Sequence, residues 1–572
     1  MSCARARAGN SPLTDAFFMS EPGIFDYIIV GGGTAACVLA NRLSEDASAR
    51  VLMLEAGPSA TSPWIKMPLA MGKLFTHPTL NWGFYTEPEP RLNNRPIFWP
   101  RGRVLGGSSS INGSAYVRGQ AEDYEGWRRL GNLGWGWSDV LPYFNKLERR
   151  EDLPPESANP AGMLNVKYPT YVHPITRAFI EACVRAGLPA SGDLNGEVSE
   201  GVSLMPNSVR NGVRHSAVEA YLRPALQRSN LRVLTSALVR RVLLKERKAI
   251  GVEYESGGKI EQARAAREVI LSAGSIGSPQ ILMLSGIGPG RHLQEHGIAV
   301  AADIPGVGEN LHDHPYTTCT YRTIAENSLN QQLRGLRVAW HAVQFYVAKQ
   351  GPLTNGASQA TALARTLPDA SGPDLQIVFR PMSHVFDSSG KIAPDPVPRI
   401  TGGVAYVRPK SRGRLLLKSN DPRQAPALWA SYLSVPSDEE GLLAGVKLVR
   451  RIFQTEPIKS RILAEDAPGE AVCTDEDIRE YMHKAATTFC HPSGSCKMGN
   501  DAMAVVDEQL RVRGIASLRV IDASIMPALP SSGPAPAVFM IAEKGADLIK
   551  RGQAAGIASL AAQTASAVFT RS

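Results

Sequence analysis

Three consecutive glycines, Gly31 to Gly33, follow an apolar run in "YIIVGGGTAACVLANRL" and lead directly into a helical pattern. Gly31 allows a tight turn out of a strand, and Gly33 lets the backbone approach a pyrophosphate, which the free N–H groups and the dipole of a helix N-terminus bind. Ala36, at the third glycine position, is small enough for close packing of the helix on the strand. Glu55 follows about 20 residues later, where it can accept hydrogen bonds from a ribose. The stretch therefore predicts a dinucleotide-binding site.

The elements that must position these residues form a βαβ unit. Residues 26–30 are a short apolar run typical of a buried strand, residues 34–44 have helical spacing, and "ARVLMLEAG" supplies a second strand. Further along, "HPITRAFIEACVRAGL" and "DEEGLLAGVKLVRRIF" have helical spacing, whereas "RITGGVAYVRP" and "GRLLLKS" alternate like strands. The sequence thus predicts a second region that mixes helices with strands.

Length, composition and charge narrow the class of protein. At 572 residues the chain exceeds a single hydrophobic core, so two domains are expected. Apolar residues make up 43% of the chain and charged residues 20%, which is typical of a globular protein. The formal charge of +9 comes from Lys and Arg scattered among acids, as in "KLERREDLPPE", so it indicates solvated surface and not a nucleic-acid partner. Seven cysteines without a CxxC pair argue against a disulfide framework or a zinc cluster, and they favour a reducing, cytoplasmic location.

The two ends of the chain differ from the rest. Residues 1–22 carry arginines but lack the apolar segment of a signal peptide, and we expect a disordered extension, most of which a start at Met19 would remove. No apolar run approaches the ~20 residues of a membrane span, so no transmembrane segment is expected. Residues 553–572 are small and weakly apolar, which favours an exposed helix and leaves peripheral contact with a membrane surface as the alternative.

Several separated motifs resemble the glucose-methanol-choline (GMC) family of flavoprotein oxidoreductases. They are "RGRVLGGSSSINGSAYVRG", "SAGSIGSPQILMLSGIGP", "GVGENLHDHP", "HPSGSCKMG", "LRVIDASIMPALP" and "FMIAEKGADLI". They occur in the family's order and extend the resemblance over nearly the whole chain. Within the family, "NWGFYTEPEPRLNNRPIFWPRGR" looks like the bacterial choline and aliphatic-alcohol dehydrogenase branch.

The resemblance implies an α/β FAD-binding Rossmann-like domain and an α+β substrate domain with an antiparallel sheet. The FAD-binding domain is expected at residues 23–160, 214–315 and 489–552, and the substrate domain at residues 161–213 and 316–488. FAD is expected to be noncovalent, because the inert Ile111 occupies the position at which some members carry a histidine that links to FAD.

The resemblance also implies a set of site residues. His491 in "TTFCHPSGSCKMG" stands where the family's active-site histidine faces flavin N5, and a neutral imidazole there can act as the base that an aliphatic alcohol needs. His312 and His314, two residues apart and without further ligands, do not indicate a metal site. The expected cofactor-binding residues are Gly31, Gly33, Thr34, Ala35, Glu55, Arg101, Gly106, Gly107, Ser108, Asn112, Val239, Asp522, Ala523 and Pro536.

One position in "SSGPAPAVFMIAEK" departs from the family pattern. Ala535 stands where a second polar residue, Asn or His, is usual. Alanine cannot donate a hydrogen bond to a developing alkoxide, a contribution worth ~2–4 kcal/mol in a preorganised site. Three explanations stay open: His491 suffices alone, Ser532 or His384 replaces the missing group, or the reaction is not simple alcohol oxidation.

The leading prediction is oxidation of a small-molecule alcohol, aliphatic or aromatic and primary, to the aldehyde, with hydride transfer to flavin N5 and His491 as base. The alternatives are lyase or decarboxylase chemistry on the same fold, and an FAD-binding structural protein that has lost activity. Oxygen and a quinone are both open as the electron acceptor.

Overall fold

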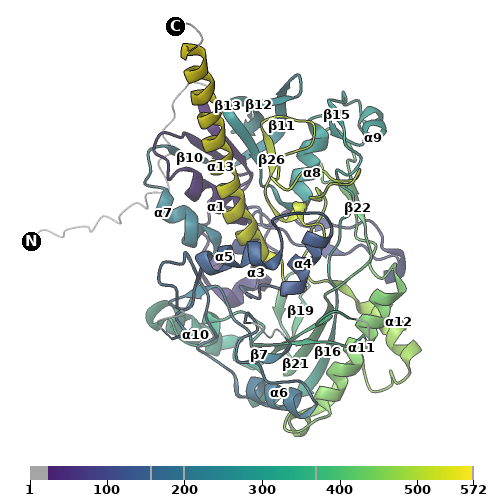
Figure 1. The fold of residues 1–572 in the computed structure, drawn as a ribbon. Coiled ribbons are helices and arrows are strands. Elements are labelled where there is room, and N and C mark those ends of the chain that lie inside the picture. The colour runs from purple at the N-terminus through teal and green to yellow at the C-terminus, as the bar shows by residue number, and fades with distance from the viewer. Residues whose placement is uncertain (1–22, 155–157, 197–199, 368–369, 389, 570–572) are drawn as a thin grey trace, which may run out of the picture.

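The computed structural model describes residues 23–154, 158–196, 200–367, 370–388 and 390–569. Two seven-stranded sheets organise the described chain. Figure 1 shows one sheet in the upper half of the molecule, around β11–β13, and the other in the lower half, around β16 and β21. The disorder that we expect for residues 1–22 lies outside the described residues.

The first sheet is built around the predicted βαβ unit. Its strand order is β10 (Leu231–Leu234), β2 (Val51–Leu54), β1 (Ile24–Val30), β13 (Lys259–Leu271), β12 (Lys248–Ser256) and β11 (Ala237–Lys245), and β26 (Leu518–Val520) also pairs with β13. The pairs from β10 to β13 and on to β26 are parallel, whereas β11, β12 and β13 form an antiparallel meander. β2 is apolar and buried throughout, as expected for a parallel strand that is covered on both faces.

Helices pack closely on this sheet. α1 (Thr34–Leu43) connects β1 to β2 as predicted, and eight of its ten residues are buried. It contacts α13 (Ala535–Phe569), which also contacts α5 (Trp137–Leu147). The small side chains of Ala36 and Ala40 are fully buried, and they allow α1 to approach its neighbours closely. α8 (Gly274–Leu284) follows β13 and contacts β11.

The second sheet is antiparallel throughout. Its strand order is β24 (Ile462–Ala467), β16 (Pro315–Thr323), β21 (Arg399–Tyr406), β18 (Leu375–Arg380), β17 (Ala360–Ala364) and β7 (Gly201–Leu204), and β25 (Thr487–Thr488) pairs with the start of β16. The predicted helices are α6 (Pro174–Arg185) and α11 (Pro436–Phe453), and both contact this sheet. Phe179 of α6 stacks on Phe379 of β18 with ring centroids 4.5 Å apart, so an aromatic core joins helix to sheet.

Short elements complete the described chain. The remaining α-helices are α2 (Pro63–Lys66), α3 (Met71–Phe75), α4 (Ala121–Arg129), α7 (Arg223–Ala225), α9 (Gly290–Glu295), α10 (Gly335–Ala348) and α12 (Asp475–Ala485). The remaining strands form small two-stranded pairs: β3 (Phe84–Tyr85) with β4 (Phe98–Trp99), β5 (Glu148–Arg149) with β6 (Leu164–Asn165), β8 (Val209–Arg210) with β9 (Val213–Arg214), β14 (Ile287–Gly288) with β15 (Ala302–Asp303), β19 (His384–Phe386) with β20 (Ile392–Pro394), and β22 (Arg414–Leu416) with β23 (Ala427–Trp429). β22 is the strand that "GRLLLKS" predicts.

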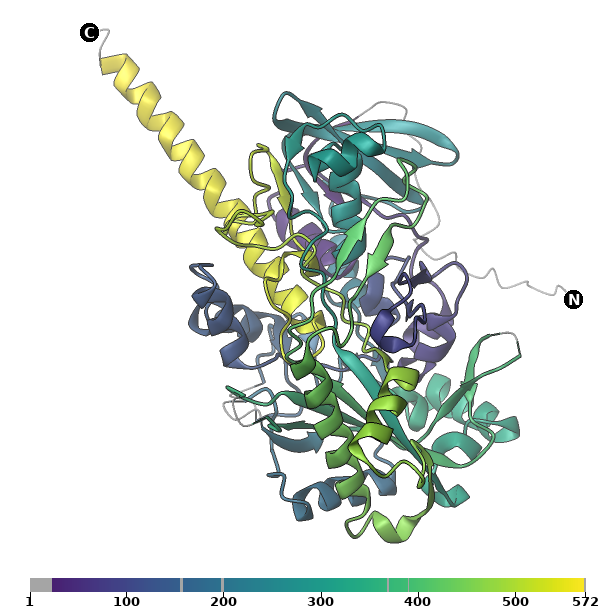
Figure 2. The ribbon, with the colours of Figure 1, turned by 90° about the vertical axis from the view of Figure 1, so that its right-hand side faces the viewer.

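The C-terminal helix extends away from the rest of the molecule. α13 runs without interruption from Ala535 to Phe569, and the expected tail from residue 553 onward continues it. Figure 2 shows its last turns projecting well beyond both sheets. None of the described helices combines the length and the apolar composition that a membrane crossing requires.

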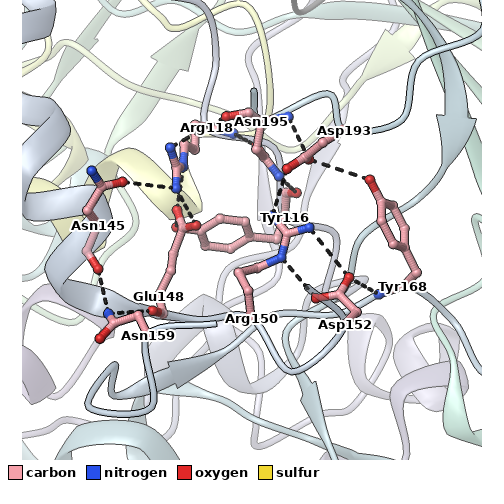
Figure 3. Close-up of polar contacts among 10 residues, drawn as sticks. All are labelled: Tyr116, Arg118, Asn145, Glu148, Arg150, Asp152, Asn159, Tyr168, Asp193 and Asn195. Atoms are coloured by element: carbon pink, nitrogen blue, oxygen red, sulfur yellow. Dashed lines mark hydrogen bonds and ion pairs between the residues drawn. The ribbon is translucent and has the colours of Figure 1, made fainter. Parts of the chain in front are cut away.

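A buried polar network fixes the segment around Val117 (Figure 3). The Arg118 guanidinium donates to both carboxylate oxygens of Glu148 at 2.6 Å, and the Tyr116 hydroxyl donates to the same carboxylate at 2.6 Å. The Arg118 backbone N–H donates to Asn195 Oδ1 at 2.8 Å. Because Glu148 is 2% exposed, Arg118 supplies the countercharge that its burial requires. The outer part of the network consists of Asn145, Arg150, Asp152, Asn159, Tyr168 and Asp193.

Candidate active site

A cavity of about 990 Å³ is lined by residues of both sheets. The first sheet contributes the carboxyl ends of β1 and β2, together with the start of β11. The second sheet contributes Tyr316 of β16 and one face of β18. The carboxyl ends of parallel strands are the usual place for a ligand in an α/β sheet, so the cavity lies where the glycine loop predicts a site.

The glycine loop has the geometry that the sequence predicts. Gly31 has a φ of +97°, and a Cβ atom there would lie 2.6 Å from the carbonyl oxygen of Ser272, so only glycine fits. The backbone N–H groups of Gly32 and Gly57 each donate to the Glu55 carboxylate at 2.7 Å. Burial raises the pKa of Glu55 to about 7. The loop thus holds a buried carboxyl group at the end of β2, on the cavity wall.

The first turn of α1 faces the same cavity. Thr34 and Ala35 line it, and the N-cap residue Gly33 has no side chain to occupy the free N–H groups of this turn. A Cβ atom on Gly107 would lie 2.8 Å from Gly33 Cα, so the loop 106–107 packs directly on the glycine loop. These features provide a site for an anionic group at a helix N-terminus.

The structure brings most of the expected cofactor residues together. The cavity is lined by Gly31, Gly33, Thr34, Ala35, Glu55, Arg101, Gly107, Ser108, Asn112, Val239, Asp522 and Ala523. Gly106 and Pro536 do not line it: the Gly106 N–H donates to the Gly32 carbonyl at 2.7 Å, and Pro536 lies in the first turn of α13. Gly106 therefore contacts the glycine loop on the side away from the cavity.

Asp522 organises the start of α8. Its carboxylate accepts hydrogen bonds from the Gly274 N–H at 2.8 Å and the Ser278 hydroxyl at 2.6 Å, and also from the N–H and hydroxyl of Ser524. Burial raises the pKa of Asp522 above its usual value. The side chain thus ties α8 to the loop that carries Ala523, and both reach the cavity.

The donor set fits a flavin dinucleotide. A helix N-terminus suits its phosphates, the Glu55 carboxyl suits a ribose, and the apolar Val239 suits the adenine face. Ile111, at the position of the covalent histidine, is 1% exposed and lines the cavity. It offers no nucleophile to a bound cofactor.

His491 lies on the cavity wall with one ring nitrogen engaged. Its Nδ1 lies 3.0 Å from Nδ1 of His314, and the two rings are nearly perpendicular. A Cβ atom on Gly533, another lining residue, would lie 3.2 Å from His491 Nε2, so the bare glycine leaves that nitrogen accessible. Burial holds the pKa of His491 well below its usual value and lowers that of His314 to about 3. Burial therefore favours the neutral form of both imidazoles.

Asp313 anchors the backbone around both histidines. Its Oδ1 accepts from the backbone N–H groups of His314 and His491, each at 2.8 Å. Its Oδ2 accepts from the hydroxyls of Tyr432 and Thr488. Burial raises the pKa of Asp313 above its usual value, and the hydrogen bonds from Thr488, Tyr432 and the His491 N–H offset only part of this increase.

Ala535 lines the cavity, and the two side chains that we expect as replacements lie in different surroundings. The Ser532 hydroxyl donates to the Val117 carbonyl at 2.8 Å and does not reach the cavity wall. His384 lines the cavity from the exposed β19–β20 hairpin. Ser532 is therefore excluded as the replacement in this conformation, and His384 is not.

Sequence reasoning missed three residues of this site: Asp313, His314 and Gly533. His314 was visible only as one of two histidines in "NLHDHP", and its ring partner lies 177 residues away. Gly533 was visible only as one glycine in a loop. No spacing in the sequence connects these residues to His491.

The fold and the cavity together define a dinucleotide-binding α/β protein, and comparison with known proteins gives its class as oxidoreductase. Residues 25–316 and 409–542 match the models of the N-terminal and C-terminal parts of GMC oxidoreductases. The chain is 42% identical over 526 residues to an oxygen-dependent choline dehydrogenase from Rhizobium etli (strain CIAT 652), a match that covers 92% of this chain and 95% of the relative. It is 39% identical over 532 residues to an alcohol dehydrogenase (acceptor) from Pseudomonas putida, covering 92% and 96%.

Comparison with a solved structure supports the same class of protein. An FAD-dependent oxidoreductase from Chaetomium thermophilum superposes with a TM-score of 0.83 at 28% identity, covering 92% of this chain and 99% of the other. The chain belongs to the GMC oxidoreductase family. The predicted family, fold class and cofactor, FAD, are confirmed.

Proposed function

We propose that this protein oxidises a primary alcohol, aliphatic or aromatic, to the aldehyde, with His491 as the base. The observation that carries the proposal is the neutral, buried imidazole of His491, whose Nδ1 is engaged by His314 while its Nε2 faces the gap left by Gly533. The named relatives act on choline or on alcohols, which supports an alcohol substrate here.

His491 supplies the base that the oxidation of an alcohol requires. An aliphatic hydroxyl is too weak an acid to lose its proton unaided near neutral pH, so a neutral imidazole beside it assists the reaction. For Nε2 to accept that proton, Nδ1 must carry the ring hydrogen. His314 Nδ1, 3.0 Å away, can accept that hydrogen when His314 carries its own ring hydrogen on Nε2. Asp313 holds both residues through their backbone N–H groups.

FAD, when bound, accepts the hydride that leaves the carbinol carbon. The chain would hold the cofactor through the glycine loop, the α1 N-terminus and Glu55, and Ile111 makes the attachment noncovalent. We also propose that the FAD-binding and substrate domains have the limits predicted from the sequence, because β26 of the first sheet lies within residues 489–552 and β7 of the second sheet lies within residues 161–213.

The electron acceptor, oxygen or a quinone, and the cytoplasmic location stay predictions.

The alanine at position 535 does not change the reaction that we propose. Lyase or decarboxylase chemistry is the alternative that this residue suggests, but the relatives are named dehydrogenases and the structural neighbour is named an oxidoreductase. We infer that His491 and the positioning of the substrate replace the missing second donor.

The test is anaerobic reduction of the bound flavin by primary alcohols in a stopped-flow instrument. His491→Ala should leave the flavin bound but slow its reduction by roughly 10²–10⁴-fold, the usual range for the loss of a general base. His77→Ala, which changes a histidine outside the cavity, is the control and should behave as wild type. An unchanged rate in His491→Ala would refute the assigned role.

A further inference from the structure

Arg380 is a cation on the cavity wall without a carboxylate partner. It ends β18 and lines the cavity together with Gln376 and Val378, which alternate along the same face of the strand. Its hydrogen bond from Nε to Ser358 Oγ is long at 3.4 Å, and no carboxylate in the described part of the chain lies within ion-pair distance. By contrast Arg423, which also lines the cavity, is paired with Glu255 at 2.7 Å.

The acids of the cavity are at its other end. Among the described lining residues the carboxylates are Glu55 and Asp522, and both already accept hydrogen bonds from the loops around the cofactor site. The end near β18 carries Arg380 and, on α3, the exposed Lys73. This end is therefore positive and offers no counterion to a substrate cation such as the quaternary ammonium of choline.

A chain of ring contacts relates Arg380 to the proposed base. The guanidinium lies over the Tyr316 ring, 5.6 Å from its centroid. Tyr316 stacks on Phe489 at 4.8 Å, and Phe489 makes an edge contact with His491 at 4.6 Å. The cation and the base therefore lie along one continuous wall, separated by aromatic rings. A substrate that touches both needs a spacer between its hydroxyl and its second functional group.

The rest of this end favours an apolar spacer, although a few polar groups also line it. The apolar lining residues here include Met67, Leu333, Leu353, Val378, Met382 and Ile392. Two of the polar groups are buried without a hydrogen-bond partner in the described chain: the Tyr316 hydroxyl and Oε1 of Gln376, which is 3% exposed. A buried polar atom without a protein partner on a cavity wall is available to a ligand or to a water molecule.

From this arrangement we infer that the substrate is an anionic alcohol, a hydroxy acid whose carboxylate pairs with Arg380 while its primary hydroxyl reaches His491 across an apolar spacer. The guanidinium fork binds a carboxylate through two parallel hydrogen bonds, and a partly buried site strengthens them. The inference rests on the proposed function and specifies its substrate. It separates this chain from its relatives that are named for choline.

The experiment compares matched probes on the holoenzyme. We would measure the concentration dependence of anaerobic flavin reduction by 6-hydroxyhexanoate, 6-hydroxyhexanamide, 4-(hydroxymethyl)benzoate, 4-(hydroxymethyl)benzamide and choline. Wild type should show at least about tenfold tighter apparent binding of each carboxylate than of its amide, on the scale of one charge-assisted hydrogen-bond pair, and should show the weakest binding for choline. Arg380→Gln should bring the ratio of the apparent affinities for carboxylate and amide near one, while Arg380→Lys should keep part of the preference for the carboxylate.

The control is Arg322→Met, which removes an exposed arginine of the same sheet that pairs with Asp466 outside the cavity. It should keep the wild-type ratio. A wild-type ratio near one, a ratio that Arg380→Gln leaves unchanged, or loss of FAD in Arg380→Gln in place of a changed ratio would overturn the inference.

A second measurement separates this inference from the proposed function. Binding of 4-methylbenzoate and 4-methylbenzamide, which have no hydroxyl, is followed by the change in flavin absorbance. If no alcohol reduces the flavin but 4-methylbenzoate binds in an Arg380-dependent way, the proposed function fails and the anion site stands. If neutral alcohols reduce the flavin and neither carboxylate series shows a preference, the function stands and the anion site fails.

Discussion

The buried position of Glu55 affects both the location of its carboxyl group and its pKa. Its carboxyl group must stay at the end of β2 before the cofactor arrives, and the N–H groups of Gly32 and Gly57 hold it there. The same burial that positions it raises its pKa to about 7, well above the usual value near 4.5. Without the cofactor, a carboxyl with a raised pKa stabilises the fold fully below pH ~4.5, and this contribution is lost as the pH rises toward 7.

This raised pKa predicts a pH dependence of FAD binding. Ribose hydroxyls donate to an ionised carboxylate, so FAD affinity of wild type should increase as the pH rises toward about 7 and level off above it. Glu55→Gln should bind FAD roughly 10- to 50-fold more weakly at pH 8 and show little of this pH dependence, on the scale of a charge-assisted hydrogen bond. Fluorescence titration of the FAD-free protein at pH 6 and pH 8 measures both effects.

Glu45→Gln, at an exposed position just after α1, is the matched control and should titrate as wild type. Equal FAD affinity in Glu55→Gln and wild type would remove Glu55 from the cofactor site.

The residue types at the cofactor end were predictable because their contacts are local. Gly31, Gly33 and Glu55 belong to one βαβ unit, in which strand, turn and helix fix each position along the chain. The pairing of His491 with His314 was not predictable from the residues, since it joins positions 177 apart through tertiary packing. The family resemblance supplied His491, but it did not supply His314, whose ring nitrogen lies 3.0 Å from that of His491.

At the scale of elements, Asp313 joins three pieces of chain. It precedes β16, its Oδ2 accepts from Thr488 of β25, and its Oδ1 accepts from the backbone of His491 just after β25. Tyr432, the fourth donor, also accepts a hydrogen bond from Trp99 Nε1 at 2.9 Å. One buried carboxylate therefore holds the edge of the second sheet and the candidate base in register.

Asp313→Ala should destabilise the protein by about 3 kcal/mol or more, because it leaves two buried backbone N–H groups and two hydroxyls without their acceptor. Asp313→Asn should cost less, since the amide oxygen can keep the N–H bonds and the hydroxyls can turn. Urea unfolding of the holoenzyme gives the order of the two variants. Asp46→Asn, at an exposed site, is the control, and equal stability of Asp313→Ala and wild type would contradict the role.

The elements differ in how far the sequence revealed them. The pattern in residues 26–54 predicts β1, α1 and β2 to within a few residues, because two apolar runs flank a segment of helical spacing that begins at the glycine turn. β18, which carries Arg380, was not predicted, because its segment "LQIVFR" is a short apolar run flanked by loop-like residues. Its place between β17 and β21 depends on antiparallel pairing with distant strands, which no local pattern encodes.

At the scale of the whole molecule, the cavity places a bound cofactor in contact with both sheets. Its walls come from both sheets, and α13 starts at the cavity with Ala535 and packs back along α1. A ligand that fills this space contacts segments from residue 31 to residue 538. Cofactor binding should therefore stabilise the molecule as a unit and not one sheet alone.

Removing the cofactor tests this coupling together with the mode of attachment. Because Ile111 offers no nucleophile, acid precipitation should release FAD into the supernatant and leave a colourless pellet. The FAD-free protein should unfold at lower temperature by both far-ultraviolet circular dichroism and tryptophan fluorescence, and added FAD should restore its stability by about 2.7 kcal/mol at a free concentration of 100 times the Kd. Riboflavin, which lacks the adenosine diphosphate portion, is the control ligand and should restore much less, since it cannot reach the glycine loop or Glu55. Yellow colour in the pellet would contradict noncovalent binding, and a transition unmoved by FAD would contradict the coupling of the two sheets through the cavity.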